Sequence, residues 1–194
     1  MRRILTLTLL LFASFAQSAD FYKGLDAYDQ GEFKTAYNEW IPLAEQGNAS
    51  AQYHLGIMYA NGEGVLQDDK QAVYWYRKAA EQGHAMAQNN LGATYREGKG
   101  VPQDDKQAVH WYQKAAEQGH AIAQYNLGVR YANGEGVLQN NIKAYMWFNL
   151  ARYNGYKNTK SAFDFMKKLM APVDVGKAQE ATNICLESNY KKCG

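Results

Sequence analysis

An internal repeat of 36 residues constrains this chain more than any other feature of its sequence. Residues 48–83 and 84–119 agree at 24 of 36 positions, and residues 84–119 and 120–155 agree at 16 of 36. Tandem units of this length each form one supersecondary element, which buries its apolar face against the neighbouring units. We therefore expect a repeat array whose central part consists of three such units.

Each unit contains the pattern of two helices. In the first unit, Ala51, Leu55 and Tyr59 recur at i, i+4 and i+8 and form one apolar stripe. The glycines of the following Gly-x-Gly segment end this helix, because glycine accommodates the backbone of a helix C-terminus. A second apolar stripe follows, and the residues expected to cap its helix in the three units are Asp69, Asp105 and Asn141. The predicted fold is all-α, an α/α superhelical solenoid of tandem helix-turn-helix repeats.

Glycine recurs inside the first helix of every unit, as Gly56, Gly92 and Gly128. A glycine in a helix interior costs about 1 kcal/mol relative to alanine. Its repetition therefore predicts a close contact between facing helices, with the tryptophan and tyrosine rings of each unit filling the space between hairpins as core.

Weaker copies of the period flank the three units. Ala36, Trp40 and Ala44 align with positions 72, 76 and 80, which predicts a degenerate N-terminal hairpin over residues 20–47. Residues 156–194 are expected to form a C-terminal helical cap, with one helix over 158–171, ended by Pro172, and another over 174–188. Terminal units diverge because one of their faces meets water instead of a neighbour.

Residues 1–19 have the layout of a secretory signal peptide. Arg2 and Arg3 precede an apolar run over residues 4–15, and small residues follow. This run is too short to span a bilayer, so we expect cleavage between about Ala16 and Asp20 and a periplasmic or secreted protein. An uncleaved short membrane anchor is the alternative. Nothing later in the sequence is apolar enough for a transmembrane helix.

The leader carries the whole net charge of the chain. The formal charge of +2 comes from its two arginines, so the mature chain has 19 basic and 19 acidic residues. A neutral chain lacks the positive surface that attracts nucleic acids or anionic membranes. We expect neither as a partner.

Cys185 and Cys193 are the two cysteines of the chain. In an exported protein such a pair favours a disulfide, whereas two free thiols on a frayed tail are the alternative. An unbroken helix of this length would separate the two Cα atoms by about 12 Å, beyond the ~7 Å that a disulfide tolerates. The bridge therefore requires the last helix to end after Cys185 and the chain to fold back around residues 188–190.

The motifs AQYHLGIMYANGEGV, AQNNLGATYREGKGV and AQYNLGVRYANGEGV, each followed by a tryptophan-containing helix, closely resemble the Sel-one-like repeats, which are relatives of the tetratricopeptide repeats. The resemblance extends over essentially the whole mature chain. It implies an α/α superhelix with a concave face and a role in protein–protein interaction, as an adaptor or scaffold of the bacterial cell envelope.

The sequence offers few residues for catalysis. His54, His84, His110 and His120 show no metal-ligand spacing with one another or with the cysteines, so we expect no metal, no cofactor and no enzyme activity. His84 and His120 instead stand at equivalent helix starts. The alternative is a cell-wall-directed hydrolase or β-lactam-binding enzyme, because Ser188-x-x-Lys191 matches the pattern of penicillin-interacting enzymes, although their partner motifs are missing.

The first helices supply the candidate surface for a protein or peptide partner. Three positions of each first helix vary between units and share one face, because they lie at i, i+4 and i+7. We expect this stripe on the concave face of the solenoid, and an ordinary solvated face is the alternative. Its residues are His54, Met58 and Asn61 in the first unit, Asn90, Thr94 and Glu97 in the second, and Asn126, Arg130 and Asn133 in the third.

Overall fold

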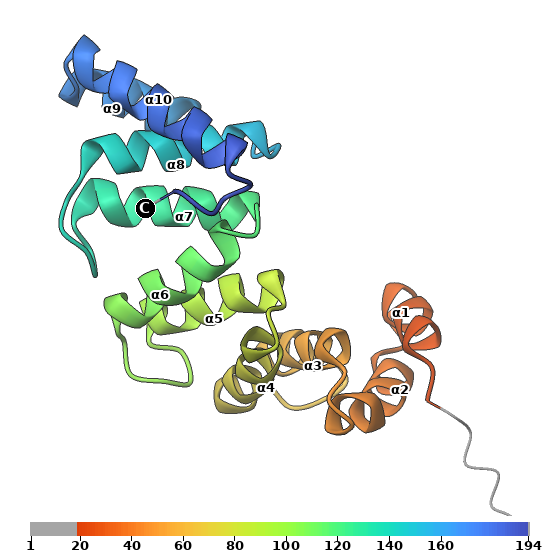
Figure 1. Cartoon of the computed structure of the whole chain (residues 1–194). Coiled ribbons are helices and arrows are strands. Elements are labelled where there is room, and N and C mark those ends of the chain that lie inside the picture. Colours follow the sequence, from red (N-terminus) through yellow and green to blue (C-terminus); the bar gives the residue numbers. More distant parts are fainter. Residues whose placement is uncertain (1–18, 194) are drawn as a thin grey trace, which may run out of the picture.

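The computed structural model describes residues 19–193, which form a curved stack of helical hairpins (Figure 1). Each hairpin contacts the next one along the chain, with α1 at one end of the stack and α9 and α10 at the other. The predicted all-α solenoid is confirmed. Its helices are α1 (Phe21–Asp29), α2 (Phe33–Glu45), α3 (Ala49–Asn61), α4 (Asp69–Glu81), α5 (Ala85–Glu97), α6 (Asp105–Ala116), α7 (Ala121–Asn133), α8 (Asn141–Tyr153), α9 (Lys160–Leu169) and α10 (Pro172–Glu187).

The predicted leader falls almost entirely on residues 1–18, which lie outside the described part of the chain. Between residues 19 and 193, no helix has both the length and the apolar character needed to cross a membrane.

Side chains cap the helices of the three central units. The second helices α4, α6 and α8 are capped by Asp68, Asp104 and Asn140, whose side-chain oxygens accept backbone N–H groups of the first turn. The caps predicted from the sequence were wrong by one residue, because two capping residues stand side by side and the earlier one takes the extended conformation. Asp69, Asp105 and Asn141 are instead the first residues of these helices.

Histidine caps two of the first helices, as its position in the sequence suggested. The backbone N–H of Ala87 donates to His84 Nδ1 at 3.3 Å, and that of Ala123 donates to His120 Nδ1 at 3.2 Å. Burial lowers the pKa of both imidazoles. Because each cap needs an unprotonated Nδ1, the neutral imidazole is the form that stabilises these helix starts.

The repeated glycine marks the tightest contact within each hairpin, which confirms the sequence-based expectation. A Cβ atom added to Gly56 would lie 2.5 Å from Cε1 of the buried Tyr76 ring, and the equivalent atom at Gly128 would lie 2.6 Å from Phe148 Cε1. The loop glycines also contribute between units. Gly100 has a φ of +71°, and its Cβ would lie 2.5 Å from the carbonyl carbon of Asp69 in the preceding unit.

A repeated glutamine joins successive hairpins. Gln88, which is buried, donates from Nε2 to the carbonyl oxygen of Ala80 at 3.0 Å, and its Oε1 accepts from Gln118 Nε2 at 2.7 Å. Gln52 and Gln124 make the same two kinds of bond with their own neighbours. The bond to the backbone carbonyl ties each hairpin to the one before it, and the bond between side chains lies within one hairpin.

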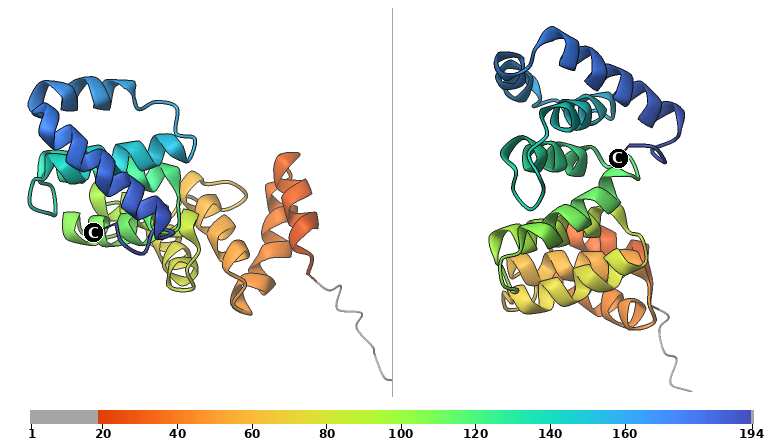
Figure 2. Two further views of the ribbon diagram at one scale, coloured as in Figure 1. Left: turned by 45° about the horizontal axis from the view of Figure 1, so that its top comes forward. Right: turned by 60° about the vertical axis from the view of Figure 1, so that its left-hand side comes forward.

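The C-terminal cap crosses the last hairpin, and its helix α10 packs on α8 (Figure 2). α9 and α10 lie close to the helices expected from the sequence, but Pro172 begins α10 instead of only ending α9. Beyond α10 the chain turns at Asn189 and Tyr190, both at positive φ, and Cys185 and Cys193 form a disulfide with their Cα atoms 4.6 Å apart. This is the fold-back that the pairing requires.

Candidate functional site

The predicted stripe of the first unit packs against the preceding hairpin. His54 is half-buried and stacks on the Trp40 ring with 4.5 Å between ring centroids. Burial lowers its pKa to about 4, and its Nδ1 atom is buried without a hydrogen-bond partner among the described residues. Met58 is fully buried in the cluster that contains Ala27 and Trp40. The prediction of a solvent-facing stripe is therefore wrong for Met58, and His54 is an inter-hairpin contact.

The same two positions are half-buried in the next units. Thr94 donates its hydroxyl to the carbonyl oxygen of Leu91 at 2.8 Å, within its own helix. Arg130 forms ion pairs with Glu135 and, at 3.8 Å, with Asp105. Asn90 and Asn126 belong to a chain of amides described below. These side chains mostly serve contacts within and between hairpins.

The third position of the predicted stripe is exposed in every unit. Asn61 and Asn133 each donate to a glutamate of the following loop at 3.1 Å, and Glu97 pairs with Arg96 and Lys99. The hydrogen bond from Lys99 lowers the pKa of the Glu97 carboxyl. The continuous stripe fails because a first helix buries two faces, one on its own partner helix and one on the preceding hairpin.

Each first helix leaves one face open, and this face lies next to the stripe that the sequence predicted. In Figure 1, α1, α3 and α5 line the inner side of the curve. Two exposed apolar side chains mark this face, Met86 at 45% and Ile122 at 48% exposure, and the exposed polar residues Asn61, Glu97 and Asn133 lie at its far end. Half-buried apolar residues stand beside them at equivalent positions of the three units. We call this surface the inner face, and it consists of Ile57, Met86, Ala93, Ile122 and Val129.

Amide side chains connect the second and third units beside the inner face. Asn126 Nδ2 donates to Asn89 Oδ1 at 3.1 Å, and Asn89 Nδ2 donates to Asn90 Oδ1 at 3.3 Å. An amide carries two donor hydrogens and an acceptor oxygen, so the half-buried Asn90 and Asn126 retain capacity for a further bond, whereas Asn89 is buried and holds them in place. The sequence prediction contained Asn90 and Asn126 but missed Asn89 and the apolar residues. The signal that could have found this face was the exposed apolar pair Met86 and Ile122 at one repeat position, since Ile57 and Val129 also pack against core clusters.

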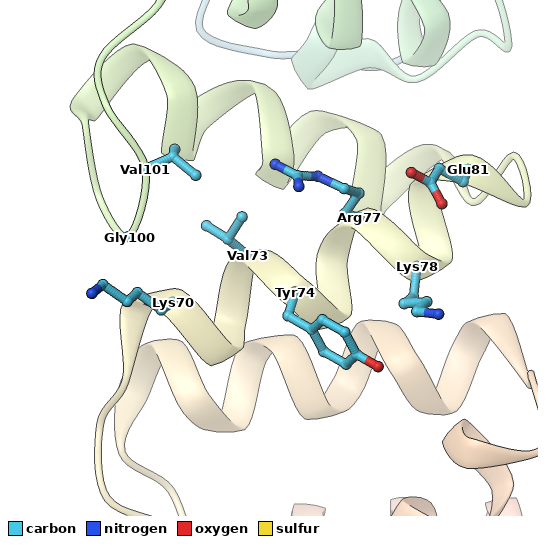
Figure 3. Close-up of a pocket in the computed structure, with 8 residues that line it drawn as sticks. All are labelled: Lys70, Val73, Tyr74, Arg77, Lys78, Glu81, Gly100 and Val101. Carbon is cyan, nitrogen blue, oxygen red and sulfur yellow. The ribbon is translucent and has the colours of Figure 1, made fainter.

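A second concave surface lies on the outer helix α4, where it meets the loop of the next unit (Figure 3). This hollow of about 470 Å³ is walled by Val73 and Val101. Three cations surround it, and Arg77 is held by a hydrogen bond to Tyr95 Oη at 2.8 Å. Tyr74 and Lys78 lie on the other side of α4, with Lys78 Nζ 5.6 Å from the centre of the Tyr74 ring. We call this surface the outer hollow, and it is lined by Lys70, Val73, Tyr74, Arg77, Lys78, Glu81, Gly100 and Val101.

The Ser188-x-x-Lys191 segment forms the turn after α10. The Ser188 hydroxyl donates to the carbonyl oxygen of Cys185 at 2.9 Å and accepts the backbone N–H of Lys192 at 3.0 Å. A serine nucleophile needs a base that takes its proton, whereas this proton points to a carbonyl oxygen. Among residues 19–193, no group of three or more His, Cys, Asp or Glu side chains is placed to hold a metal ion.

A family model for the Sel1 repeat matches the chain three times, over residues 49–84, 85–120 and 121–156. A solved Sel1 repeat protein from Oxalobacter formigenes is 35% identical with a TM-score of 0.69, over 73% of this chain and 56% of that protein. A protective antigen of uropathogenic Escherichia coli strains, which displays the same type of fold, is 30% identical with a TM-score of 0.50. That match covers 88% of this chain and 46% of the antigen.

A curated relative is the exopolysaccharide production negative regulator of Rhizobium leguminosarum bv. viciae. It is 39% identical over 54 residues, which are 27% of this chain and 20% of the regulator. The chain therefore matches about a fifth of the regulator's length and about half the length of the two solved structures.

Proposed function

The chain belongs to the Sel1 repeat family, whose members typically mediate protein–protein interactions, and from this premise we propose that it is an exported, non-catalytic scaffold of the bacterial cell envelope. In this proposal it holds an extended peptide segment of a partner protein along the inner face. The alternative enzyme function is disfavoured, because the Ser188 hydroxyl is engaged in a turn.

The observation that carries the proposal is the composition of the inner face. Exposed Met86 and Ile122 lie in successive units, with the amides of Asn89 and Asn126 joined beside them. An extended peptide presents side chains and, between them, backbone N–H and C=O groups. Apolar contacts therefore supply affinity, while amides that both donate and accept satisfy the peptide backbone. A surface of this kind suits a peptide better than a charged small molecule.

Two features support export. The sequence of residues 1–19 has the pattern of a cleavable leader. Cys185 and Cys193 are joined in the structure, and such bonds persist in the periplasm and outside the cell but are rare in the cytosol. A regulatory role would also agree with the name of the rhizobial relative.

Site-specific photo-crosslinking tests the proposal in living cells. A photoreactive amino acid is placed at Met86 or Ile122 on the inner face and, as matched controls, at Tyr74 or His110 on the outer helices, which are also exposed. We expect the inner positions to give the same crosslinked partner and the outer positions to give none. Adducts from Tyr74 alone would transfer the binding site to the outer hollow.

Substitution then separates recognition from folding. Replacing Met86 and Ile122 by serine removes exposed apolar contacts, so it should reduce crosslinking from a probe at Ala93 at least tenfold while the melting temperature changes little. Unchanged crosslinking in this double variant would refute the inner face as the binding surface.

A further inference from the structure

The N-terminal end of the solenoid exposes a surface that is built to contact a preceding hairpin. A Cβ on Gly24 of α1 would meet Trp40 of α2, as a Cβ on Gly56 of α3 would meet Tyr76 of α4. This equivalence places Tyr22 and Asp26 of α1 at the positions that His54 and Met58 occupy in α3. In α3 both positions pack against the hairpin before it.

In α1 this stacking surface is open to solvent. Tyr22 is 75% exposed and Asp26 is exposed; Asp29, which matches the exposed Asn61 of α3, lies on the same side of the helix, because the three residues lie at i, i+4 and i+7. Within residues 19–193, Asp26 and Asp29 form no ion pair, whereas the neighbouring Lys23 pairs with Glu39. We call Tyr22, Asp26 and Asp29 the N-end face.

The opposite end of the solenoid carries exposed apolar residues among lysines. α9 packs on α8 through Phe163 and Met166, so its other side is free. On that side Phe165 is 51% and Leu169 50% exposed, and Val173 at the start of α10 is 65% exposed. Lys168 lies on that side, three residues after Phe165, whereas Lys167 lies at the edge of the packed side, four residues after Phe163; neither has an ion-pair partner in the part of the chain that the structure describes. We call Phe165, Lys167, Lys168, Leu169 and Val173 the C-end face.

The two ends have opposite charge, although the mature chain is neutral. Residues 20–47 contain six acidic and two basic residues, a net charge of −4. Residues 156–194 contain four acidic and seven basic residues, a net charge of +3. α1 and α9 lie at opposite ends of the stack (Figure 1), so a second copy in the same orientation would bring unlike charges together.

We propose that the protein associates head to tail, with the C-end face of one copy seated on the N-end face of the next. The lysines of α9 then approach Asp26 and Asp29, while Tyr22 covers the apolar side chains of Phe165 and Leu169. Such a contact joins two different surfaces and leaves one of each free. It therefore produces open chains or rings of copies instead of a two-fold dimer. The solenoid and its inner face become longer than one chain.

Sedimentation velocity on the protein expressed from the full sequence tests this association. We expect a sedimentation coefficient that rises with protein concentration and falls when salt is raised from about 0.05 M to about 0.5 M, because salt screens exposed charges. Asp26→Lys with Asp29→Lys, or Lys167→Glu with Lys168→Glu, should each weaken the association at least tenfold through like-charge repulsion.

Mixing the two charge-reversal variants is the decisive arm. Each variant alone has one reversed end, but the mixture again offers ends of opposite charge, so association should return. A variant that had merely lost its fold would not be rescued. A mixture of the two variants that stays unassociated would overturn the head-to-tail arrangement.

The apolar part of the contact has its own control. Phe165→Ser with Leu169→Ser should abolish the concentration dependence. Leu66→Ser with Leu138→Ser removes two apolar residues that are even more exposed, from loops between the ends, and should leave it intact. A wild-type protein that sediments as a monomer at every concentration would refute the proposal. So would an association that neither pair changes.

Discussion

The glycine inside each first helix gives the sharpest test of how these hairpins are held together. We predict that Gly56→Ala destabilises the protein and that Gly176→Ala stabilises it, although both positions are helical. The Cβ of alanine at position 56 would lie 2.5 Å from Tyr76 Cε1, whereas a Cβ at position 176 meets nothing within 4 Å. The same chemical change should therefore have opposite signs at the two sites.

The size of each effect follows from two opposing contributions. Alanine gains about 1 kcal/mol over glycine in a helix interior, and at Gly176 nothing opposes this gain. At Gly56 the inserted methyl group meets a ring that is 4% exposed and has little room to move. Overpacking of this kind costs about 1–3 kcal/mol, and the severity of the clash places it at the upper end. We expect a net loss of about 2 kcal/mol, or ~4–8 °C in melting temperature.

Urea denaturation followed by circular dichroism measures both variants against the wild type. Gly92→Ala adds a graded point, because its Cβ would lie farther from the facing ring, 2.8 Å from Tyr112. It should destabilise less than Gly56→Ala. A Gly56→Ala protein as stable as the Gly176→Ala protein would show that the Tyr76 ring can shift. The close contact would then not explain the repeated glycine.

Three further predictions concern pH, the disulfide and the turn serine. The pKa of His54 is about 4 in the folded protein against an ordinary value of 6.5, so its contribution to stability is complete above pH 6.5 and is lost as the pH falls towards 4. About 2 kcal/mol should disappear over that range after allowance for partial exposure, and His54→Phe should flatten this part of the pH profile while His110→Phe does not. Cys193→Ser should cost about 2–3 kcal/mol in the chain-entropy model, and mass spectrometry of the unreduced wild type should find no alkylatable thiol. Ser188→Ala should lower the melting temperature slightly and leave a chromogenic β-lactam unhydrolysed, as in the wild type, whereas turnover that depends on Ser188 would favour the enzyme.

Most of the fold follows from the repeat because the period specifies both helices of every unit. The stripe through Leu55, the glycine at position 56 and the fold-back between Cys185 and Cys193 could all be inferred from spacing and elementary geometry. The predicted helix caps were wrong where two residues that can cap a helix are neighbours in the sequence. Asp68 and Asp69 can each cap a helix, and only the backbone conformation decides between them.

The binding surface was harder to infer because variation between units has two sources. Positions 54 and 58 vary since each must fit its own neighbour: His54 stacks on Trp40, and Asn126 bonds to Asn89. The sequence of a single unit does not show that its first helix packs on the preceding hairpin as well as on its own partner helix. The inner face was not predicted because Met86 and Ile122 are apolar, and apolar residues in a helix are expected to be buried in the core.

The inner face draws only a few side chains from each hairpin, so any peptide bound there must contact several units at once. Its geometry then depends on the angle between hairpins, to which the buried Gln88 contributes through its hydrogen bond to the carbonyl oxygen of Ala80 in the preceding hairpin at 3.0 Å. Residues that never touch the partner can therefore set the affinity by setting the curvature of the stack. This separation lets the surface vary while the repeated residues hold its shape, which explains why a chain so constrained in its core can still present a distinct surface to a partner.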